Sequence, residues 1–373
     1  MAEGKISAAA ARSHTRKSKS NSNSFAGILK KLLVVFFAGF AAWAIRPPPP
    51  TKLGSSDITT PRIKLRDGRH LSYVEAGVPK DKAKFKVIFV HGFDCNKYFN
   101  PFAVAASPAL VEELGVYHVS IDRPGYGESD PHPNRTVKSL ALDIEEFADH
   151  LNLGPRFYVA GYSMGGQVMW SVLKYIPHRL AGAILIAPAI NYWWPNLPSD
   201  LTNEAFSRQL PQDRWAMRVA HHLPWLTYWW NTRKWLPPFS AIVGNPVIYS
   251  PSDVEVFTKL YAATAEDPNK AQKMRSGPRQ QGEFESLHRD LNIGSGKWEF
   301  DPLDVENPFP NNDGSVHLWM GDDDRIVPVS LERYFAQKLE WIKYHEVAGA
   351  GHMMAFQGEV VDAILKASFN LKN

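Results

Sequence analysis

Short, almost wholly apolar runs recur in this chain from about residue 60 onward, and segments with helical periodicity separate them. Such runs are typical of strands buried on both faces of a parallel sheet. The five clearest are Val87–Val90, Val116–Ile121, Phe157–Ala160, Ala183–Ile186 and Val316–Trp319. Ahead of them, the turn signal Asp67-Gly68 separates two short strand-like runs and predicts an antiparallel hairpin. Interleaved strands and helices predict an α/β fold with a largely parallel sheet.

The strand rhythm breaks between residues 191 and 312, where the sequence is rich in Trp and Pro and irregularly helical. Seven of the twelve tryptophans fall in its first half: Trp193, Trp194, Trp215, Trp225, Trp229, Trp230 and Trp235. Strand-like runs resume after this stretch. We therefore expect residues 191–312 to be an insertion into one core formed by residues 61–190 and 313–373.

The first 60 residues differ in composition from the rest of the chain. Residues 1–31 form a basic tail that we expect to be disordered, because its Ser-, Ala-, Lys- and Arg-rich sequence can bury little apolar surface. Residues 32–46 form a hydrophobic segment that carries no charge up to Ile45. Residues 47–60 begin with four prolines and are expected to be a stiff spacer.

The hydrophobic segment has three possible interpretations. Its uninterrupted apolar run, the basic residues before it and Trp43 near its far end favour a single-pass signal anchor, with the body in the lumen of the endoplasmic reticulum or secretory pathway. The Ser and Arg bias is also found in transit peptides for plastids or mitochondria. A cleaved secretory signal could use Ala42-Trp43-Ala44, although the region before its apolar run would be unusually long.

The formal net charge of +4 comes from the first 50 residues, which hold eight Lys or Arg and one acid. The rest of the chain carries more acidic than basic residues. It gives no electrostatic reason to expect nucleic acid binding. The single cysteine, Cys95, excludes an intrachain disulfide, and no Cys/His cluster has the spacing of a zinc site.

A serine flanked by glycines follows the third of the five apolar runs. Gly161-Tyr-Ser163-Met-Gly165 lies between that strand-like run and a helical run that ends near Pro177. A sharp turn from strand to helix needs small residues on both sides of a nucleophile, because the backbone is strained and its neighbours approach closely. The context therefore favours a nucleophilic serine over a chance match.

A serine hydroxyl is a good nucleophile only when a positioned base takes its proton and a carboxylate orients that base. Both partners follow Ser163 in the chain. His352 lies in a glycine-flanked loop after a strand-like run, and three consecutive aspartates follow the last of the five apolar runs. We expect Asp324 to orient His352, and Asp322 and Asp323 to cap the loop or face solvent.

An oxyanion site can be assigned from the first long strand-like run. That run leads into His91-Gly92-Phe93, where Gly92 allows the chain to turn. The amides of Phe93 and Met164 are the expected donors to a developing oxyanion. We expect His91 to be a structural residue of the turn.

Taken together, these motifs resemble those of the α/β-hydrolase-fold serine hydrolases, including plant members with a membrane anchor. The matching sequences are HGF (91–93), DRPGYGESD (122–130), GYSMGG (161–166), GDDDRIVP (321–328) and GAGH (349–352). The resemblance implies a mostly parallel eight-stranded sheet, with a helical lid inserted after the sixth strand, where residues 191–312 fall. It also implies the triad Ser163, Asp324 and His352, no metal or organic cofactor, and a structural role for residues 122–130.

Hydrolysis of a carboxylic ester through an acyl-enzyme is the simplest chemistry for such a site. Epoxide hydrolases and dehalogenases of this fold place aspartate where this chain has Ser163, which argues against both. Acyl transfer, thioester cleavage or a cyclase reaction would use the same triad. A hormone-like ligand receptor of the same fold is a further alternative, which slow single turnover would distinguish.

The aromatic rings of the insertion are expected to line an apolar substrate tunnel or to rest on the bilayer surface, and both alternatives predict a hydrophobic substrate, either lipid-like or a specialised metabolite. The candidate substrate-binding residues are Trp193, Trp194, Trp229 and Trp230. Separately, Asn134-Arg-Thr136 is an acceptor sequence for N-glycosylation, and we expect it in an exposed loop. It can be modified only if the body enters the secretory lumen.

Overall fold

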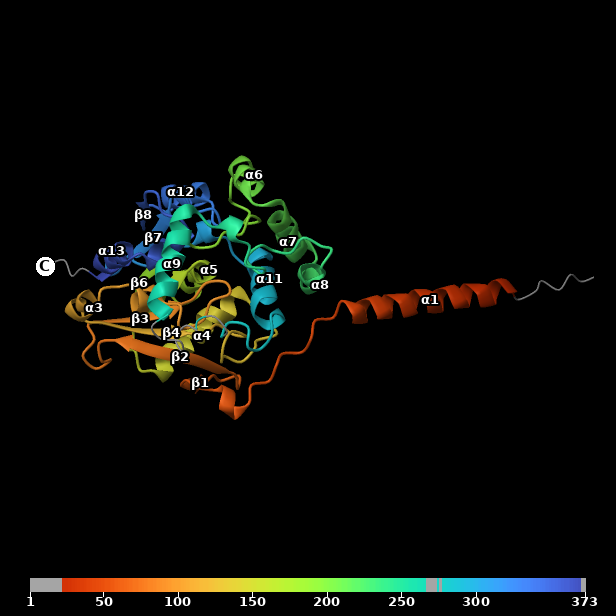
Figure 1. Cartoon of the computed structure of the whole chain (residues 1–373), viewed down its shortest axis with the longest axis horizontal. Helices are drawn as coiled ribbons and strands as arrows, with labels where there is room; N and C mark the ends of the chain where they lie inside the picture. Colours follow the sequence, from red (N-terminus) through yellow and green to blue (C-terminus); the bar gives the residue numbers. More distant parts are fainter. Residues whose placement is uncertain (1–21, 266–273, 275–276, 370–373) are drawn as a thin grey trace, which may run out of the picture. The chain divides into compact units, whose positions relative to one another are not determined.

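The computed structural model describes residues 22–265, 274 and 277–369 (Figure 1). They fall into two units, one ending at Arg46 and the other starting at Pro47. The second unit is called the body.

The first unit contains helix α1, Ser22–Ala44. Its stretch Gly27–Ala44 has a mean hydropathy of 1.7 and is long and apolar enough to cross a membrane; a signal sequence would meet the same criteria. The helix begins ahead of the predicted hydrophobic segment, so residues 22–31 of the predicted disordered tail are helical. The apolar run continues backward across Lys30 and Lys31, which are good helix formers. Residues 1–21 of that tail lie outside the described residues.

The body contains an eight-stranded sheet in the order β1-β2-β4-β3-β5-β6-β7-β8. Its strands are β1 (Arg62–Lys64), β2 (His70–Gly77), β3 (Phe85–Val90), β4 (Val116–Ile121), β5 (Phe157–Tyr162), β6 (Leu180–Ile186), β7 (Val316–Gly321) and β8 (Ile342–Val347). β2 is antiparallel to β1 and β4, and the pairs from β4 to β8 are parallel. The predicted hairpin and the mostly parallel α/β sheet are confirmed.

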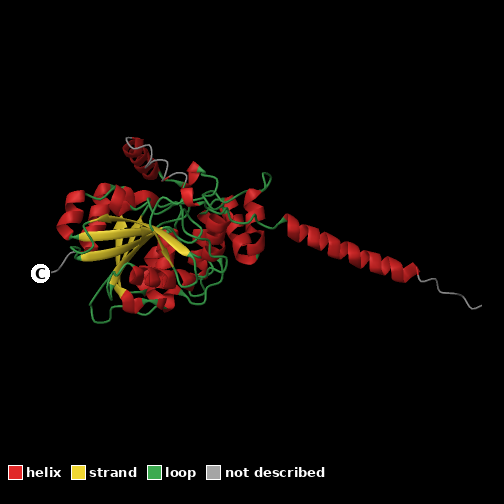
Figure 2. Cartoon of the chain, turned by 90° about the horizontal axis from the view of Figure 1, so that it is seen from below, coloured by secondary structure: helices red, strands yellow, loops and turns green. Residues whose placement is uncertain are grey.

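Helices cover both faces of this sheet (Figure 2). Every residue of β4 and β7 is buried, as expected for central strands covered on both sides. The helices that flank the sheet are α2 (Pro101–Val104), α3 (Pro108–Leu114), α4 (Val137–His150), α5 (Met164–Tyr175), α12 (Val329–Lys338) and α13 (Gly358–Phe369). Short helical turns are η1 (Ser55–Asp57), η2 (Pro177–Arg179) and η7 (His352–Phe356).

The connection from β6 to β7, here called the β6–β7 segment (residues 187–315), contains the predicted insertion 191–312. Its described helices are α6 (Ser199–Arg208), α7 (Pro211–His222), α8 (Thr227–Thr232), α9 (Pro251–Ala265) and α11 (Arg289–Ser295). Its shorter helical turns are η3 (Pro224–Leu226), η4 (Pro246–Ile248), η5 (Phe284–His288) and η6 (Pro302–Asp304).

A buried ionic cluster ties the β6–β7 segment to the core. The Asp290 carboxylate on α11 lies 2.5 Å from Arg123 Nη2 and 2.8 Å from Arg135 Nη2. The Tyr126 hydroxyl donates to the same carboxylate at 2.6 Å. Because all four side chains are almost completely buried, each charge depends on the others for compensation.

We expect Asp290→Ala to lower the free energy of unfolding by about 3 to 5 kcal/mol, because it leaves two guanidinium groups buried without a counterion. Urea denaturation followed by circular dichroism measures the change. Asp149→Ala is the matched control: it breaks an exposed pair with Arg179, so the loss should stay under about 1 kcal/mol. Equal losses in the two variants would contradict the role assigned to Asp290.

Candidate active site

Ser163 occupies the turn that joins β5 to α5, and its backbone is in an unfavourable conformation. Its φ of 55° and ψ of −117° are rare for a residue with a side chain. Close packing requires glycine on either side. A Cβ on Gly161 would lie 2.2 Å from the carbonyl oxygen of Gly165, and a Cβ on Gly165 would lie 2.1 Å from that of Val90. The predicted strand-turn-helix context of Ser163 is therefore present.

Three residues from distant parts of the sequence meet at this turn. His352 Nε2 lies 2.9 Å from Ser163 Oγ, and His352 Nδ1 lies 2.7 Å from Asp324 Oδ2. All three side chains are buried. This is the geometry in which a carboxylate orients an imidazole toward a nucleophile.

The three consecutive aspartates have different surroundings. Asp324 Oδ1 accepts from the amides of Ile326 and Val327, which fixes the carboxylate while Oδ2 faces His352. Asp322 Oδ1 accepts from the Gly349 amide at 2.6 Å and so caps the neighbouring loop. Asp323 is half exposed and lies 3.6 Å from the Arg325 guanidinium. Asp324 is thus the member of the run that contacts the imidazole.

The electrostatic surroundings of His352 favour its protonated form. Burial lowers the pKa of His352. The charge of Asp324, its hydrogen bond to the ring and the charge of Asp253 all raise this pKa, and together they outweigh burial. The net result is a pKa raised above the ordinary value of 6.5. An imidazole that attracts a proton more strongly is a better base toward the serine hydroxyl.

Two residues of α9 hold the His352 loop, and sequence reasoning missed both. Asp253 Oδ1 accepts from the Met353 amide at 2.6 Å, and Ser252 Oγ accepts from the Gly351 amide at 2.9 Å. Asp253 also exchanges hydrogen bonds with Ser250 at the start of α9. The pattern Ser-x-x-Asp in residues 250–253 is a capping-box signal that could have located the helix start, although not its contact with the loop.

The loop of the expected oxyanion donors lies directly beside Ser163. A Cβ on Gly92 would lie 3.0 Å from Ser163 Cβ, so the backbone leading to Phe93 passes directly beside the serine. Met164 is the first residue of α5, where backbone amides have no partner within the helix. His91 is buried, accepts from the Arg123 amide at 3.0 Å and lies 2.8 Å from Gly92 O, contacts that fit the structural role expected of it.

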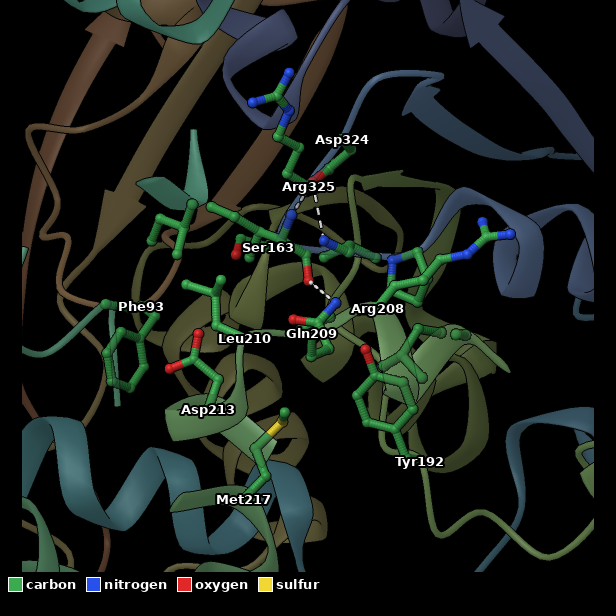
Figure 3. Close-up of a pocket in the computed structure, with 18 of the residues that line it drawn as sticks. Phe93, Ser163, Tyr192, Arg208, Gln209, Leu210, Asp213, Met217, Asp324 and Arg325 are labelled. Atoms are coloured by element: carbon green, nitrogen blue, oxygen red, sulfur yellow. Dashed lines mark hydrogen bonds between the residues drawn. The ribbon is translucent and has the colours of Figure 1, made fainter. Parts of the chain in front are cut away.

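Two cavities meet at Ser163, which borders both. The larger, about 400 Å³, contains polar groups, and Figure 3 shows Asp213 and Met217 of α7 pointing into it. Burial raises the pKa of the Asp213 carboxyl. The smaller, about 300 Å³, is more aromatic. Its wall includes Phe99, Tyr162, Tyr249, Phe257, Leu260 and Met353.

The four candidate substrate-binding tryptophans lie outside the residues that line either cavity. Trp194 is buried, with its ring 5.1 Å from that of Trp298. Trp193 stacks on His221 at 4.2 Å. Both rings thus pack among side chains of their own segment, and a role for them in substrate binding stays a prediction.

The other two tryptophans, Trp229 and Trp230, also face aromatic neighbours. Their rings lie 5.3 Å from Trp235 and 6.2 Å from Trp215, respectively. A role for these two rings in substrate binding likewise stays a prediction.

Asn134 is exposed in a turn before α4, as expected for an acceptor site. Thr136 of the same sequence caps that helix, and its Oγ1 accepts from the Ser139 amide at 3.1 Å. Modification of Asn134 stays a prediction.

We expect Asp324→Asn to lower the pKa of His352, because it removes the negative charge that favours the imidazolium. Asp253→Asn should lower it as well. Asp323→Asn is the matched control and should leave it unchanged, since its carboxylate pairs with Arg325. Titration of the imidazole protons by nuclear magnetic resonance, assigned with His352→Gln, measures the three variants. An unchanged pKa in Asp324→Asn would contradict the coupling described here.

Comparison with known proteins agrees with this fold. A family model described as "Alpha/beta hydrolase family" matches residues 87–364. Among solved structures, a thermophilic esterase from Thermogutta terrifontis is similar with a TM-score of 0.52 and 20% sequence identity, covering 83% of this chain and 97% of that one. At that identity the likeness shows the fold alone.

Two curated relatives match over about a third of the chain. The dihydrolipoyllysine-residue acetyltransferase component of an acetoin cleaving system from Pseudomonas putida is 35% identical over 126 residues, 33% of this chain and 31% of that protein. The pimeloyl-[acyl-carrier protein] methyl ester esterase of Sodalis glossinidius is 28% identical over 131 residues, 34% of this chain and 47% of that protein. The matches thus span less than half the length of either relative. The family model covers most of the body, and the chain belongs to the alpha/beta hydrolase family.

Proposed function

We propose that this protein is a serine hydrolase that cleaves carboxylic esters of hydrophobic alcohols or acids. The observation that carries the proposal is the hydrogen-bonded series Ser163, His352 and Asp324 at a junction of two cavities. The similarity to a protein named as a methyl ester esterase supports the same reaction class.

In the proposed reaction, Ser163 Oγ attacks the ester carbonyl carbon while His352 Nε2 takes the hydroxyl proton. The carbonyl oxygen becomes negatively charged in the tetrahedral intermediate, and the amides of Phe93 and Met164 donate to it. The intermediate collapses as the carbon–oxygen bond to the alcohol breaks, and His352 gives its proton to the departing alcohol. Water then attacks the acyl-enzyme by the same steps, which releases the acid and restores Ser163.

The two cavities support a substrate with a sizeable group on each side of the ester bond. The walls of both cavities are mostly apolar, and the smaller one, which Asp94 and His352 also border, is the more aromatic, so it suits an apolar group. The larger one holds Asp213 and suits a group with a hydrogen-bond donor. This assignment replaces the tryptophans as the basis for a lipid-like or specialised-metabolite ester.

The β6–β7 segment is proposed to act as a lid over these cavities. It supplies Asp213 and Met217 to the larger cavity and Phe257 and Leu260 to the smaller one. A cover of this kind excludes water from the ester and strengthens the electrostatic interactions beneath it.

Substitution of the three residues tests the reaction. Ser163→Ala and His352→Ala should abolish both fluorophosphonate labelling and ester turnover. Asp324→Asn should lower kcat by about 10⁴-fold, because the imidazole is held in the wrong tautomer. Asp322→Asn, with its carboxylate on the Gly349 amide, is the control and should retain most activity. A single slow turnover by the wild type would instead favour a ligand receptor.

The protonation of His352 sets the direction in which kcat/KM depends on pH. His352 must be neutral to accept the serine proton, and its pKa is raised above 6.5. The value of kcat/KM should therefore fall on the acid side, with a midpoint above pH 6.5.

Cavity-narrowing variants test the substrate class. In wild-type protein, each added methylene that enters an apolar wall should raise kcat/KM about fourfold, at about 0.8 kcal/mol per buried group. Leu260→Phe should flatten this rise, because residue 260 lines the smaller cavity. Val254→Phe adds the same ring to an exposed face of α9 and should change nothing. If Met217→Phe, and not Leu260→Phe, flattens the rise of kcat/KM with chain length, the apolar group lies in the larger cavity.

Helix α1 is proposed to anchor the body to a membrane of the secretory pathway, with the body in the lumen. In cells, the full chain should stay with the membranes during alkaline carbonate extraction. A glycosidase that removes N-glycans should make the protein migrate faster in gel electrophoresis. Asn134→Gln should abolish that shift, because Asn134 is the proposed acceptor. Release by carbonate would contradict the anchor, and import into a plastid with a shortened N-terminus would favour a transit peptide.

A further inference from the structure

Exposed tryptophans gather on adjacent elements of the β6–β7 segment. Trp215 of α7, Trp225 of η3 and Trp235 after α8 are 54%, 59% and 70% exposed. Trp215 pairs with Trp230, and Trp229 pairs with Trp235, so two ring pairs meet at the adjacent residues Trp229 and Trp230 of α8. We call these five residues the tryptophan patch. Figure 1 shows α7 and α8 beside each other at one end of the body.

Basic side chains lie beside rings of the tryptophan patch: the Arg218 guanidinium is 5.8 Å from the Trp215 ring, and the Arg233 guanidinium is 5.8 Å from the Trp229 ring. Residues 211–239 contain four basic residues, Arg214, Arg218, Arg233 and Lys234. The acid in this range, Asp213, is buried and accepts from the Ser240 amide. Tryptophan rings beside Lys and Arg are typical of surfaces that rest at a membrane interface, where the ring lies among headgroups and the cation meets anionic lipid.

The spacer enters the body near the same elements. The Thr51 amide donates to Gln281 O at 3.0 Å, three residues before η5 begins. The η5 residue Phe284 packs edge to face on Tyr228 of α8, at 5.8 Å. Residues 47–51 are therefore attached to the part of the body that carries the tryptophan patch.

We propose that the tryptophan patch rests in the headgroup region of an anionic membrane. The inference rests on the proposed anchor and deepens the proposed substrate class. Helix α7 links the two sites, because Trp215 and Arg218 lie on its exposed face while Asp213 and Met217 line the larger cavity. The tryptophan patch and the wall of the larger cavity are therefore built on different faces of one helix.

Quenching by brominated lipid tests this contact. Full-length protein with Trp43→Phe, which removes the tryptophan of α1, is reconstituted into vesicles of phosphatidylcholine and phosphatidylserine with or without brominated acyl chains. Brominated vesicles should lower the tryptophan fluorescence. Trp225→Ser with Trp235→Ser should reduce that decrease at least about twofold, because these are the most exposed rings. Trp341→Phe removes a tryptophan outside the patch and should leave the decrease intact.

Charge-reversal variants provide a second test in the same quenching experiment. On phosphatidylserine vesicles, Arg233→Glu with Lys234→Glu should lower the equilibrium constant for contact between the patch and the membrane at least about 25-fold. Each basic residue near an anionic surface contributes about fivefold to that constant. On phosphatidylcholine alone, the wild type should show less quenching. Quenching that is independent of phosphatidylserine would overturn the anionic-membrane assignment.

The possible results distinguish membrane contact of the tryptophan patch from the proposed anchor and from the proposed hydrolase activity. Hydrolysis of a water-soluble ester in detergent should be the same for the wild type and the patch variants. Equal fluorescence in brominated and plain vesicles, with hydrolysis and vesicle retention intact, overturns the patch alone. A chain that vesicles do not retain overturns anchor and patch together, and absence of hydrolysis overturns the hydrolase. Cross-linked dimers that require Trp225 and Trp235 would make the patch a protein interface and overturn it.

Discussion

The parallel pairing of the central strands determines where the chemistry of this protein can occur. In a parallel sheet the carboxyl ends of neighbouring strands meet at one edge. Ser163 follows β5, Asp324 follows β7 and His352 follows β8, so residues far apart in sequence end within hydrogen-bond distance. The strained backbone at Ser163 is held by this frame: its amide donates to Ile186 O, and its carbonyl accepts from the Ala189 amide. The remaining features of the site are built around that edge.

Much of this arrangement could be predicted from the sequence, because short-range signals encode it. Apolar runs located the central strands, and the glycines around Ser163 indicated a sharp turn that the close contacts of Gly161 and Gly165 explain. The choice of Asp324 among three adjacent aspartates agrees with its place beside His352. In each case the informative residues are neighbours in sequence, so their pattern can be recognised without knowledge of the fold.

Features that depend on contacts between distant elements could not be predicted in this way. The number of tryptophans showed an unusual aromatic content, but not which rings point inward, and Trp194 packs on Trp298 more than a hundred residues later. The support of the His352 loop by Ser252 and Asp253 is likewise a tertiary contact. The start of α1 was misplaced for another reason, since two lysines interrupt the apolar run without interrupting the helix.

The contact between α9 and the His352 loop constrains how this protein can diverge. A segment that only shapes a cavity can change its side chains without disturbing the residues beneath it. Here, however, the same segment also supplies two acceptors to the loop of the imidazole. An exchange of the β6–β7 segment between relatives would therefore alter reactivity along with selectivity, unless the incoming sequence brought its own equivalents of Ser252 and Asp253. Any sequence that replaces this segment must therefore preserve both acceptors to keep the His352 loop in place.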